Sequence, residues 1–560
     1  MGFQLSPGVN VSEIDLTTVV PSVLTTAGAF AGTFRWGPAN KVVLVDSEIT
    51  LSKTFGTPDD DSAISFFTAA NFLSYGNNLS VVRAVGSNAR NALVNTQQVL
   101  RIDNSDDFQY TYLNANTENM YGSFAARYPG SIGNSLSVQV IDSGCDFESW
   151  TYSSYFPSAP GTSDQCSSLG GSDDELHIVV IDFQGKITGT QGKVLETFPF
   201  VSKAIDSTYN GESNYYKQTI FNKSKYVYAL DPVLYSNTHS TWGRSGSTSF
   251  ATIADPIEAI LGGGVDSVPS AANTNTAFSH FVNKETTNIS LVLTGNPDTT
   301  VQQYVIDNIV NQRQDCVAFI SPPSLATVNN SGSEVASIKS WLSSLSRSSS
   351  YVVADCGWKY QFDVYNNVYR WIPLNADIAG LCVNTDNVRD PWYSPAGFSR
   401  GAVKNAIKLA WNPNKTERDL LYSVGVNPVV SFPGQGVVLF GDKTLQSKPS
   451  AFDRINVRRL FIVLEKAIGL ASKYQLFEFN DDFTRAQFKA IVEPFLRDVQ
   501  GKRGITDFRV KCDSGNNTGD VVDRNEFVAD IYIKPARSIN YITLSFIATR
   551  TGIDFSTLGA

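Results

Sequence analysis

The sequence has few of the residues from which catalytic and metal sites are built. Among 560 residues there are three histidines and six cysteines, and no two cysteines form a C-x-x-C pair. Zinc sites and disulfide frameworks need such residues at short, regular spacings. The H-E-x-x-H and Walker A patterns are also missing from the sequence. We therefore expect no enzymatic activity, no metal and no cofactor, and we expect the cysteines to be buried free thiols.

Charged residues and long apolar runs are scarce too. Only 17% of the residues are charged, and 44 Lys+Arg against 53 Asp+Glu give a net charge of −9. An acidic chain has no general attraction for nucleic acid or anionic lipid. No stretch approaches the roughly 18 apolar residues of a membrane helix, and the first residues lack the pattern of a secretory signal. We expect neither a direct nucleic-acid partner nor a membrane partner.

The rest of the composition is typical of a large folded protein. Hydrophobic residues make up 42% of the chain, so most of it can bury a core, and 560 residues exceed what one core holds. At about 150 residues per domain, the length predicts three or four domains. The fold class that we expect is α+β, a mixed α/β multi-domain protein.

Two regions between the ends of the chain differ in pattern. Residues 89–250 are rich in Ser, Tyr, Gly, Asn and Asp, and their short strand-like runs, such as Leu136 to Ile141 and His177 to Phe183, alternate with polar loops. This predicts a β-rich, outward-facing insertion of one or two domains. Residues 289–357 alternate strand-like runs with two helical patterns, which indicates a β-α-β-α-β unit and a parallel sheet. Asp298 and Ser333 are the predicted caps of the two helices. We assign residues 21–88 and 251–410 to an α/β middle domain.

Both ends of the chain have the pattern of β-strands. An unpaired strand is a template for another chain, so we predict arms that pair with neighbouring copies. Residues 1–20 are the N-terminal arm in this interpretation, and residues 411–560 are a C-terminal domain that ends in a strand arm. Within that domain, the period-two alternation at 527–533 and 539–549 predicts two strands. The residues that define the two arms are Val9, Val11 and Ile14 at one end and Ile542, Leu544 and Phe546 at the other.

The stretch from Phe452 to Lys511 is basic although the chain is acidic. It holds 12 Lys+Arg and 8 Asp+Glu, a local charge of +4, and its apolar spacing predicts an amphipathic helix. A second helix is predicted from about 483 to 499, with its cap at 480–482. Two interpretations stay open for the cations of this stretch. They are either an ordinary solvated helix face or a surface for a polar partner. The candidates for the second are Arg454, Arg458, Arg459, Lys466 and Lys473.

Several stretches along the chain together resemble a known family. They are Ser6 to Asp15 (SPGVNVSEID), Gly28 to Pro38 ending in WGP, Phe55 to Pro58, Arg127 to Leu136 (RYPGSIGNSL), Gly262-Gly263, Ser394 to Gly397, and Gly425 to Leu445 with GVNP and GQGVVLFGDKTL. In this order they are similar to motifs of the tail sheath proteins of contractile-tailed phages and related injection machines. Residues 140–250 match no part of that pattern.

The resemblance implies a structural subunit of a contractile tail sheath, located in the virion tail after assembly in the host cytoplasm. It implies that copies form stacked six-fold rings around an inner tail tube and contract to drive the tube through the host envelope. Baseplate and tail terminator proteins are further implied partners, and the five cations become candidates for facing the tube. It also implies a conserved core domain made from the C-terminal region and the N-terminal strand, with the other domains inserted.

The unmatched residues 140–250 leave two alternatives open. One is a glycan hydrolase with its site in this region. The other is a tail-associated carbohydrate-binding or adhesion module whose aromatic side chains stack on sugars. The aromatic candidates are Trp150, Tyr152, Tyr155 and Trp242.

Overall fold

The chain divides into two compact units. The computed structural model describes residues 20, 23–113, 121–230, 241–296 and 298–540. Unit 1 comprises Met1–Pro21, Trp392–Ser394 and Ala467–Ala560, and unit 2 comprises Ser22–Pro391 and Pro395–Lys466. No helix among the described residues is both long enough and apolar enough to cross a membrane.

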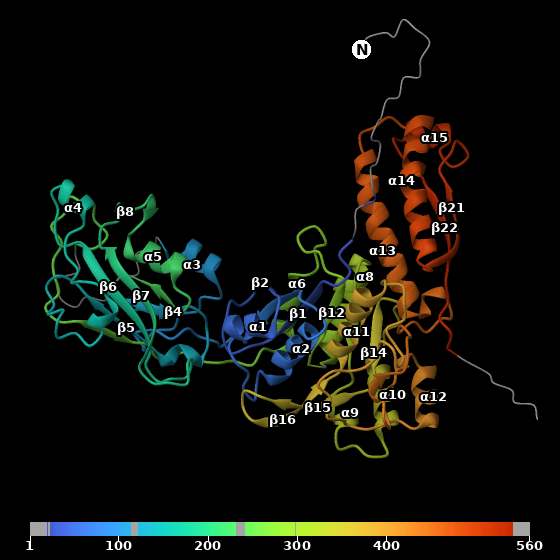
Figure 1. The fold of residues 1–560 in the computed structure, drawn as a ribbon, viewed down its shortest axis with the longest axis horizontal. Coiled ribbons are helices and arrows are strands. Elements are labelled where there is room, and N and C mark those ends of the chain that lie inside the picture. The colour runs from blue at the N-terminus through green and yellow to red at the C-terminus, as the bar shows by residue number, and fades with distance from the viewer. Residues whose placement is uncertain (1–19, 21–22, 114–120, 231–240, 297, 541–560) are drawn as a thin grey trace, which may run out of the picture. The chain divides into compact units, whose positions relative to one another are not determined.

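A seven-stranded sheet lies in unit 2 (Figure 1). Its order is β18-β14-β13-β12-β1-β3-β2, and only β2 runs antiparallel to its neighbour. The ladders β12-β13 and β13-β14 are parallel, which confirms the β-α-β-α-β unit predicted over 289–357. Its strands are β1 (Gly28–Thr33), β2 (Val42–Val45), β3 (Leu79–Ala84), β12 (Leu291–Leu293), β13 (Val317–Ile320), β14 (Val352–Asp355) and β18 (Val426–Asn427).

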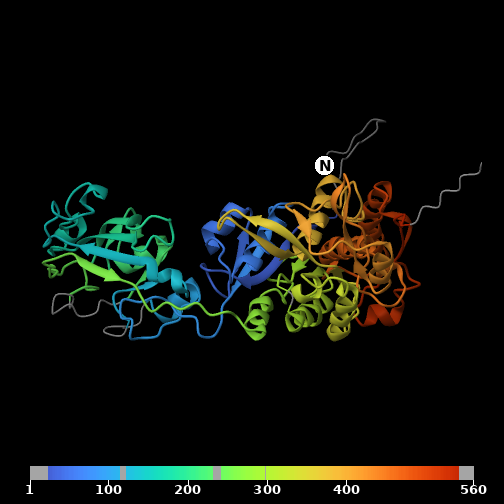
Figure 2. The ribbon, with the colours of Figure 1, turned by 90° about the horizontal axis from the view of Figure 1, so that it is seen from below.

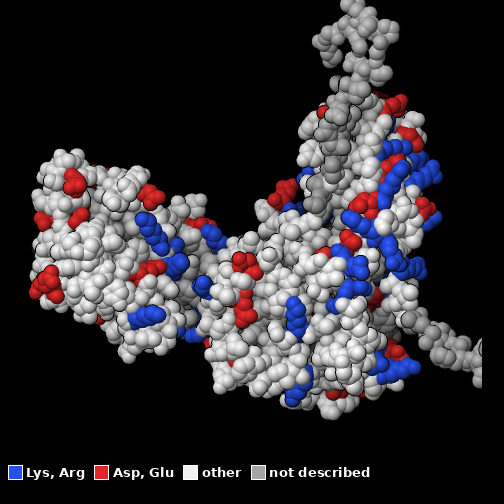
Figure 3. Space-filling model, viewed as in Figure 1, with Lys and Arg blue, Asp and Glu red and all other residues white. Residues whose placement is uncertain are grey.

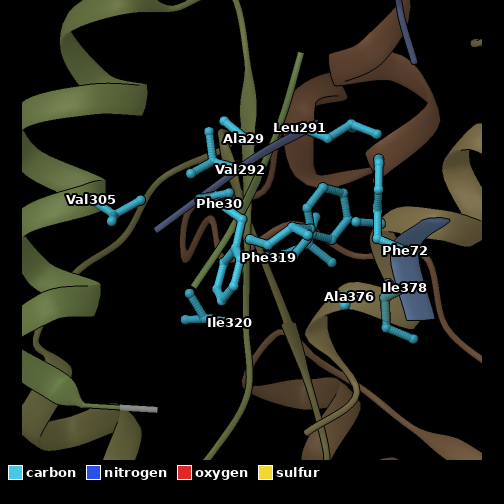
Figure 4. Close-up of a cluster of buried hydrophobic side chains, with 14 of the residues drawn as sticks. Ala29, Phe30, Phe72, Leu291, Val292, Val305, Phe319, Ile320, Ala376 and Ile378 are labelled. Carbon is cyan, nitrogen blue, oxygen red and sulfur yellow. The ribbon is translucent and has the colours of Figure 1, made fainter. Parts of the chain in front are cut away.

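Helices cover both faces of this sheet. Figure 4 shows two strand residues, Phe30 and Phe319, in the middle of the core. Val305 lies on one side of them, and the helix residues Phe72 and Ile378 lie on the other. Both α2 and α11 are buried along most of their length, and α2 (AISFFTAANFL) holds no charged residue to keep in water. The helices packed in this unit are α1 (Glu48–Phe55), α2 (Ala63–Leu73), α6 (Ala271–Ser279), α7 (Thr299–Tyr304) with a π-helical turn at Val305–Val310, α8 (Asn311–Arg313), α9 (Ser324–Thr327), α10 (Glu334–Leu345) and α11 (Asn375–Val388).

A second sheet of unit 2 is antiparallel and has its own core. Its order is β11-β5-β6-β7, and it lies in the cyan and green part of the chain in Figure 2. Strand β5 matches the predicted strand at Leu136–Ile141. Strand β11 belongs to this sheet, so the sheet includes residues beyond 250, the predicted end of the insertion. The domain boundaries themselves stay predictions. The elements of this region are α3 (Ser105–Thr111), β4 (Phe124–Ala126), β5 (Leu136–Ile141), α4 (Asp164–Ser168), β6 (Glu175–Asp182), β7 (Lys193–Ser202), β8 (Thr208–Tyr209), β9 (Glu212–Ser213), α5 (Tyr216–Lys223), β10 (Val227–Ala229) and β11 (Ile257–Ile260).

Besides the two-stranded pairs β4-β10 and β8-β9 of the preceding region, unit 2 has two small antiparallel sheets later in the chain. The first has the order β16-β15-β17, and the second is the hairpin β19-β20. Helix α13 begins in unit 2 and ends in unit 1, because the division falls at residue 467. The elements are β15 (Trp358–Asp363), β16 (Val368–Pro373), β17 (Lys408–Leu409), α12 (Lys415–Ser423), β19 (Val429–Phe432), β20 (Gly436–Leu439) and α13 (Ile455–Ser472).

Unit 1 contains a long helix packed on a two-stranded antiparallel hairpin. Asp481 caps α14 by accepting from the backbone N–H of Thr484, which confirms the cap predicted at 480–482. Pro494 lies inside this helix, and the chain leaves the helix after Gly501. The predicted strand at 527–533 appears as β22, shifted by about three residues. The elements are α14 (Asp482–Gly501), β21 (Ile505–Lys511), α15 (Gly519–Asp523) and β22 (Asp530–Pro535).

Candidate functional site

The predicted site residues fall into two groups. The six arm residues lie outside the described residues, so their pairing with other copies stays a prediction. They are Val9, Val11, Ile14, Ile542, Leu544 and Phe546. The five basic residues predicted to face a tube are all described, and their surroundings within the chain differ from one to the next.

Arg454 lies just before α13 and is half-buried. Its Nη1 donates to Asp442 Oδ1 at 2.9 Å and also to the hydroxyl of Tyr422. Asp442 belongs to the GDKTL motif, and in the neighbouring GVNP motif Asn427 donates from Nδ2 to the carbonyls of Ala354 and Lys443. The family-like motifs at 425–445 therefore hold the end of β14 and the start of α13 together through buried polar contacts.

Arg458 and Arg459 are buried, with 6% and 4% of their surface exposed. The guanidinium of Arg458 lies over the rings of Tyr351 and Phe452, at 4.2 and 4.0 Å from their centroids. Arg459 forms a two-pronged ion pair with Asp386, at 2.8 and 2.6 Å. These guanidinium groups stabilise the inside of unit 2 and present little surface to any partner. The spacing of polar residues along the helix did not indicate that they are buried.

Lys466 and Lys473 differ from each other in exposure. Lys466 is half-buried, and its ammonium donates to the carbonyl of Ile289 at 2.7 Å and to Ser290 Oγ at 3.1 Å. Burial lowers the pKa of Lys466. Lys473 is exposed in the turn that follows α13. Of the five predicted cations, Lys473 has the exposure that a surface contact requires, and its partner stays a prediction.

Two of the motifs meet at a buried arginine that the sequence did not single out. Arg83, at the end of β3, is 2% exposed, and its guanidinium donates to four backbone carbonyls at 2.8–3.2 Å. Burial lowers its pKa to about 10, so the group stays charged at neutral pH. A planar fork of donors suits such a cluster of acceptors. The acceptors belong to Phe34, Arg35 and Gly37 of one motif and to Pro129 of the other.

The RYPGSIGNSL motif also packs against the glycine turn at 262–264. Asn134 and Gly264 exchange two hydrogen bonds of 2.9 and 2.8 Å. A Cβ atom on Gly264 would lie 2.5 Å from the carbonyl oxygen of Gly130, so only glycine fits at this approach. Gly130 itself has a φ of 140°, which residues with a side chain rarely adopt. The glycines of these motifs therefore serve backbone packing.

Two fully buried lysine–aspartate pairs also escaped the sequence analysis. Lys203 Nζ lies 2.8 Å from Asp142 Oδ2, and Lys359 Nζ lies 2.9 Å from Asp377 Oδ1, with no exposed side-chain surface on any of the four residues. Burial raises the pKa of Asp377 and lowers that of Lys359. No motif signals such pairs, because each joins segments that are distant in sequence.

The described residues offer little for chemistry. No three His, Cys, Asp or Glu side chains among them converge as metal ligands. All six cysteines are buried free thiols, as expected, and burial raises the pKa of Cys316 and of Cys356 to about 12. Of the aromatic residues considered for sugar stacking, Trp150 is buried and donates to Gln139 Oε1, whereas Tyr155 is 55% exposed.

Comparison with known proteins decides the family. Three family models match successive parts of the chain: the tail sheath protein Gp18 domain III N-terminal region over residues 25–84, the phage tail sheath protein central domain over 291–445, and the phage tail sheath C-terminal domain over 447–549. The tail sheath protein of Vibrio phage KVP40 is 34% identical, with 99% of each chain covered. The chain belongs to the phage tail sheath protein family. The tail sheath protein of Enterobacteria phage T4 is 32% identical, again over 99% of each chain.

Solved sheath proteins share the fold at low sequence identity. The sheath tail protein Lin1278 of Listeria innocua has a TM-score of 0.54 at 12% identity, covering 91% of this chain and 92% of its own. The sheath of an extracellular contractile injection system, PVC, has a TM-score of 0.52 at 12% identity, covering 98% and 99%. The mixed α/β multi-domain fold expected from the sequence is thus confirmed.

Membership of the tail sheath family also answers the question of activity. The relatives are structural tail proteins, so the expectation of a non-enzymatic protein is confirmed, and the alternative of a glycan hydrolase is excluded. As a tail sheath protein the chain is a component of the virion tail. The site of such a protein is its set of surfaces for assembly, and the buried contacts above determine the shape of the body that carries them.

Proposed function

We propose that copies of the chain polymerise into a helical sheath of stacked six-fold rings around a tail tube. The sheath contracts and drives the tube through the host envelope. The observation that carries this proposal is the match to tail sheath proteins over 99% of the chain. Baseplate and tail terminator proteins complete the assembly, which forms in the host cytoplasm. A neighbour in fold, the PVC sheath, was solved as a sheath complex in a contracted state.

The energy for contraction comes from contacts between copies in this proposal. The sheath assembles in an extended, metastable lattice, and the copies then rotate as rigid bodies into a lattice with more buried contact. A difference of about 2 kcal/mol per copy, within the usual range of coupling energies, becomes large when it is summed over a hundred or more copies. No nucleotide is consumed.

The two terminal segments link the copies. The alternation of Ile542, Leu544 and Phe546 supports a strand that adds to a sheet of the next copy, and Val9 to Ile14 supports the same at the other end. Such arms stay paired while the bodies rotate, so the sheath shortens without dissociating.

Contact with the tube is polar in this proposal, because a sheath must hold its tube without locking to it. Lys473 is the exposed member of the cations predicted for this role. On the face drawn in Figure 3, further Lys and Arg side chains gather over the part of unit 1 that carries α14, β21 and β22. Charge reversal at Lys473, together with the exposed Arg497 and Arg509, is expected to reduce co-assembly with the tube protein.

Electron microscopy tests polymerisation directly. Concentrated full-length protein is expected to form hollow tubes. Replacing Ile542, Leu544 and Phe546 with serine is expected to leave the protein monomeric, because the apolar face of the arm is lost. The matched control replaces Thr543 and Ser545, which alternate with these residues in the predicted strand, with alanine and should polymerise. Tubes that form normally without residues 541–560 would show that the arm is not required.

A further inference from the structure

The turn between α13 and α14 exposes an unusual number of large apolar side chains. Phe477 is 105% exposed, Phe479 is 85% exposed and Phe483 is 75% exposed. Tyr474 and Leu476 add exposures of 68% and 63%. We call these five residues the aromatic turn. All of them belong to unit 1, where Figure 1 shows α14 following α13.

The aromatic turn is held in place by hydrogen bonds. Asn480 donates from Nδ2 to the carbonyl of Glu526 at 2.7 Å, and Arg485 donates to Asn480 Oδ1 at 2.8 Å. Asp481 caps α14 immediately afterwards. Phe477 has a φ of 73°, a conformation that residues other than glycine rarely adopt. The rings are therefore presented on a fixed backbone, which lowers the entropy lost when a partner covers them.

The exposed area matches a stable protein contact. A large aromatic side chain carries about 150–250 Å² of surface, so the aromatic turn exposes roughly 700–800 Å². A standard protein–protein interface buries about 800 Å² on each partner, and the largest apolar patch on a monomer is usually about 300–600 Å². The aromatic turn is thus the size of one side of an interface.

The chain carries a second exposed aromatic cluster, in unit 2. Phe398, Phe432 and Phe440 have ring centroids 5.2–6.0 Å apart, and the guanidinium of Arg418 lies 5.9 Å from two of them. Phe398 is 54% exposed and Phe440 is 43% exposed. We call these four residues the phenylalanine cluster. Its rings offer edge-to-face contacts to further rings. Phe398 directly follows the SPAG motif, Phe432 ends β19 and Phe440 directly follows β20, while Arg418 lies in α12.

We infer that the aromatic turn of one copy packs on the phenylalanine cluster of a second copy. Contact between two different patches of the same chain is heterologous, so it propagates from copy to copy instead of closing a dimer. This suits an open helical polymer, and the inference rests on the proposed polymerisation. A tube protein is the other possible occupant. A contact of this size and apolarity would lock the sheath to the tube, whereas copies of the sheath have to stay joined to one another.

Disulfide cross-linking tests the contact between copies. The six native cysteines are buried, so cysteines introduced at the surface react selectively. A mixture of Phe479→Cys and Phe398→Cys proteins, oxidised after polymerisation, is expected to give a covalent dimer that neither protein gives alone. In the control, Tyr209→Cys, at a residue 69% exposed, replaces Phe398→Cys and should give no such dimer. No mixed dimer from the first pair, or cross-linking of Phe479→Cys to co-assembled tube protein instead, overturns the inference.

A second variant separates this inference from the proposed function. Serine at Phe477, Phe479 and Phe483 is expected to raise the concentration needed for polymerisation at least tenfold and to leave the thermal unfolding of the monomer unchanged. Serine at Tyr110 and Leu325, which are 88% and 86% exposed, is the matched control. If the triple variant polymerises like wild type, the inference fails and the proposed function stands. If wild-type protein never polymerises, the proposed function itself fails.

Discussion

The buried pair of Lys359 and Asp377 gives the sharpest prediction about stability. Lys359 Nζ donates to Asp377 Oδ1 and to the carbonyl of Lys404, both at 2.9 Å. The hydroxyl of Tyr75 donates to the same carboxylate oxygen at 3.2 Å. Among the described residues, no donor reaches Asp377 Oδ2. The substitution Lys359→Met keeps most of the length of the side chain and removes its charge.

The expected loss of unfolding free energy is about 4 kcal/mol. Two hydrogen bonds from a charged group disappear, each worth about 1.5–3 kcal/mol, and one carboxylate stays behind in apolar surroundings. Loss of one partner of a buried pair costs about 3–5 kcal/mol in other proteins. The double variant Lys359→Met/Asp377→Leu removes both charges, so its cost is expected to be below about 1.5 kcal/mol.

The single variant also acquires a pH dependence. Without the ammonium group, burial raises the pKa of Asp377 further in the folded chain, above its unfolded value of about 3.9. The folded state then binds more protons than the unfolded state. The stability of Lys359→Met is therefore highest below about pH 4 with respect to this group and declines as the pH rises through the folded pKa of Asp377.

Urea unfolding followed by tryptophan fluorescence measures these changes, because Trp341 and Trp358 are buried in unit 2. Lys415→Met, at an exposed lysine, serves as the control and should change stability by no more than about 0.5 kcal/mol. A loss below about 1 kcal/mol for Lys359→Met would refute the reasoning. So would a double variant that is as unstable as the single one.

Two further predictions concern other buried groups. Arg83→Lys is expected to lower the free energy of unfolding by about 3 kcal/mol, because an ammonium cannot satisfy four separate carbonyls. Urea unfolding measures this loss, with Arg90→Lys at an exposed arginine as the control. Equal stabilities of the two variants would contradict the prediction. His177 is buried, accepts from the backbone N–H of Phe200, and has a pKa lowered by burial. The neutral His177 contributes its full stabilisation above its unfolded pKa of about 6.5, and this stabilisation is lost as the pH falls through the lowered folded pKa. Between pH 7 and pH 5, the midpoint temperature of thermal unfolding should therefore fall further in wild type than in His177→Gln.

Local patterns predicted many of the elements. The strand Leu136–Ile141 was correct because its apolar residues are bounded by polar turns, and Asp298 caps α7 as expected by accepting from the N–H groups of Thr300 and Val301. Ser333 precedes α10 as predicted but makes no side-chain cap bond. Signals of this kind reside in neighbouring residues, so the sequence can reveal them without knowledge of the fold.

Long-range pairings account for what the sequence could not reveal. Gly28 pairs with Leu291, so β12 lies beside β1 although the residues of the insertion separate them in the sequence. The periodicity of a strand does not show which other strand it pairs with. Arg459 was assigned to a polar surface because of its place on the helix, yet its partner Asp386 approaches from α11, 73 residues away. Whether a charged residue meets solvent or an opposite charge depends on such distant segments. The aromatic turn was missed as well, because the sequence does not show whether an apolar residue is buried or exposed.

The distribution of these groups bears on the proposed contraction. Rigid-body rotation requires each copy to keep its internal structure while contacts between copies change. In unit 2, displacing Arg83, Lys203 or Lys359 from its partners would leave a buried charge uncompensated, at a cost of several kcal/mol, so this body resists internal change. The described part of unit 1 instead exposes the aromatic turn and most of its cations, whose surface ion pairs change at a cost of about 0–1 kcal/mol. Substitutions at the buried pairs should therefore alter the unfolding of the monomer, whereas substitutions in the aromatic turn should alter polymerisation alone.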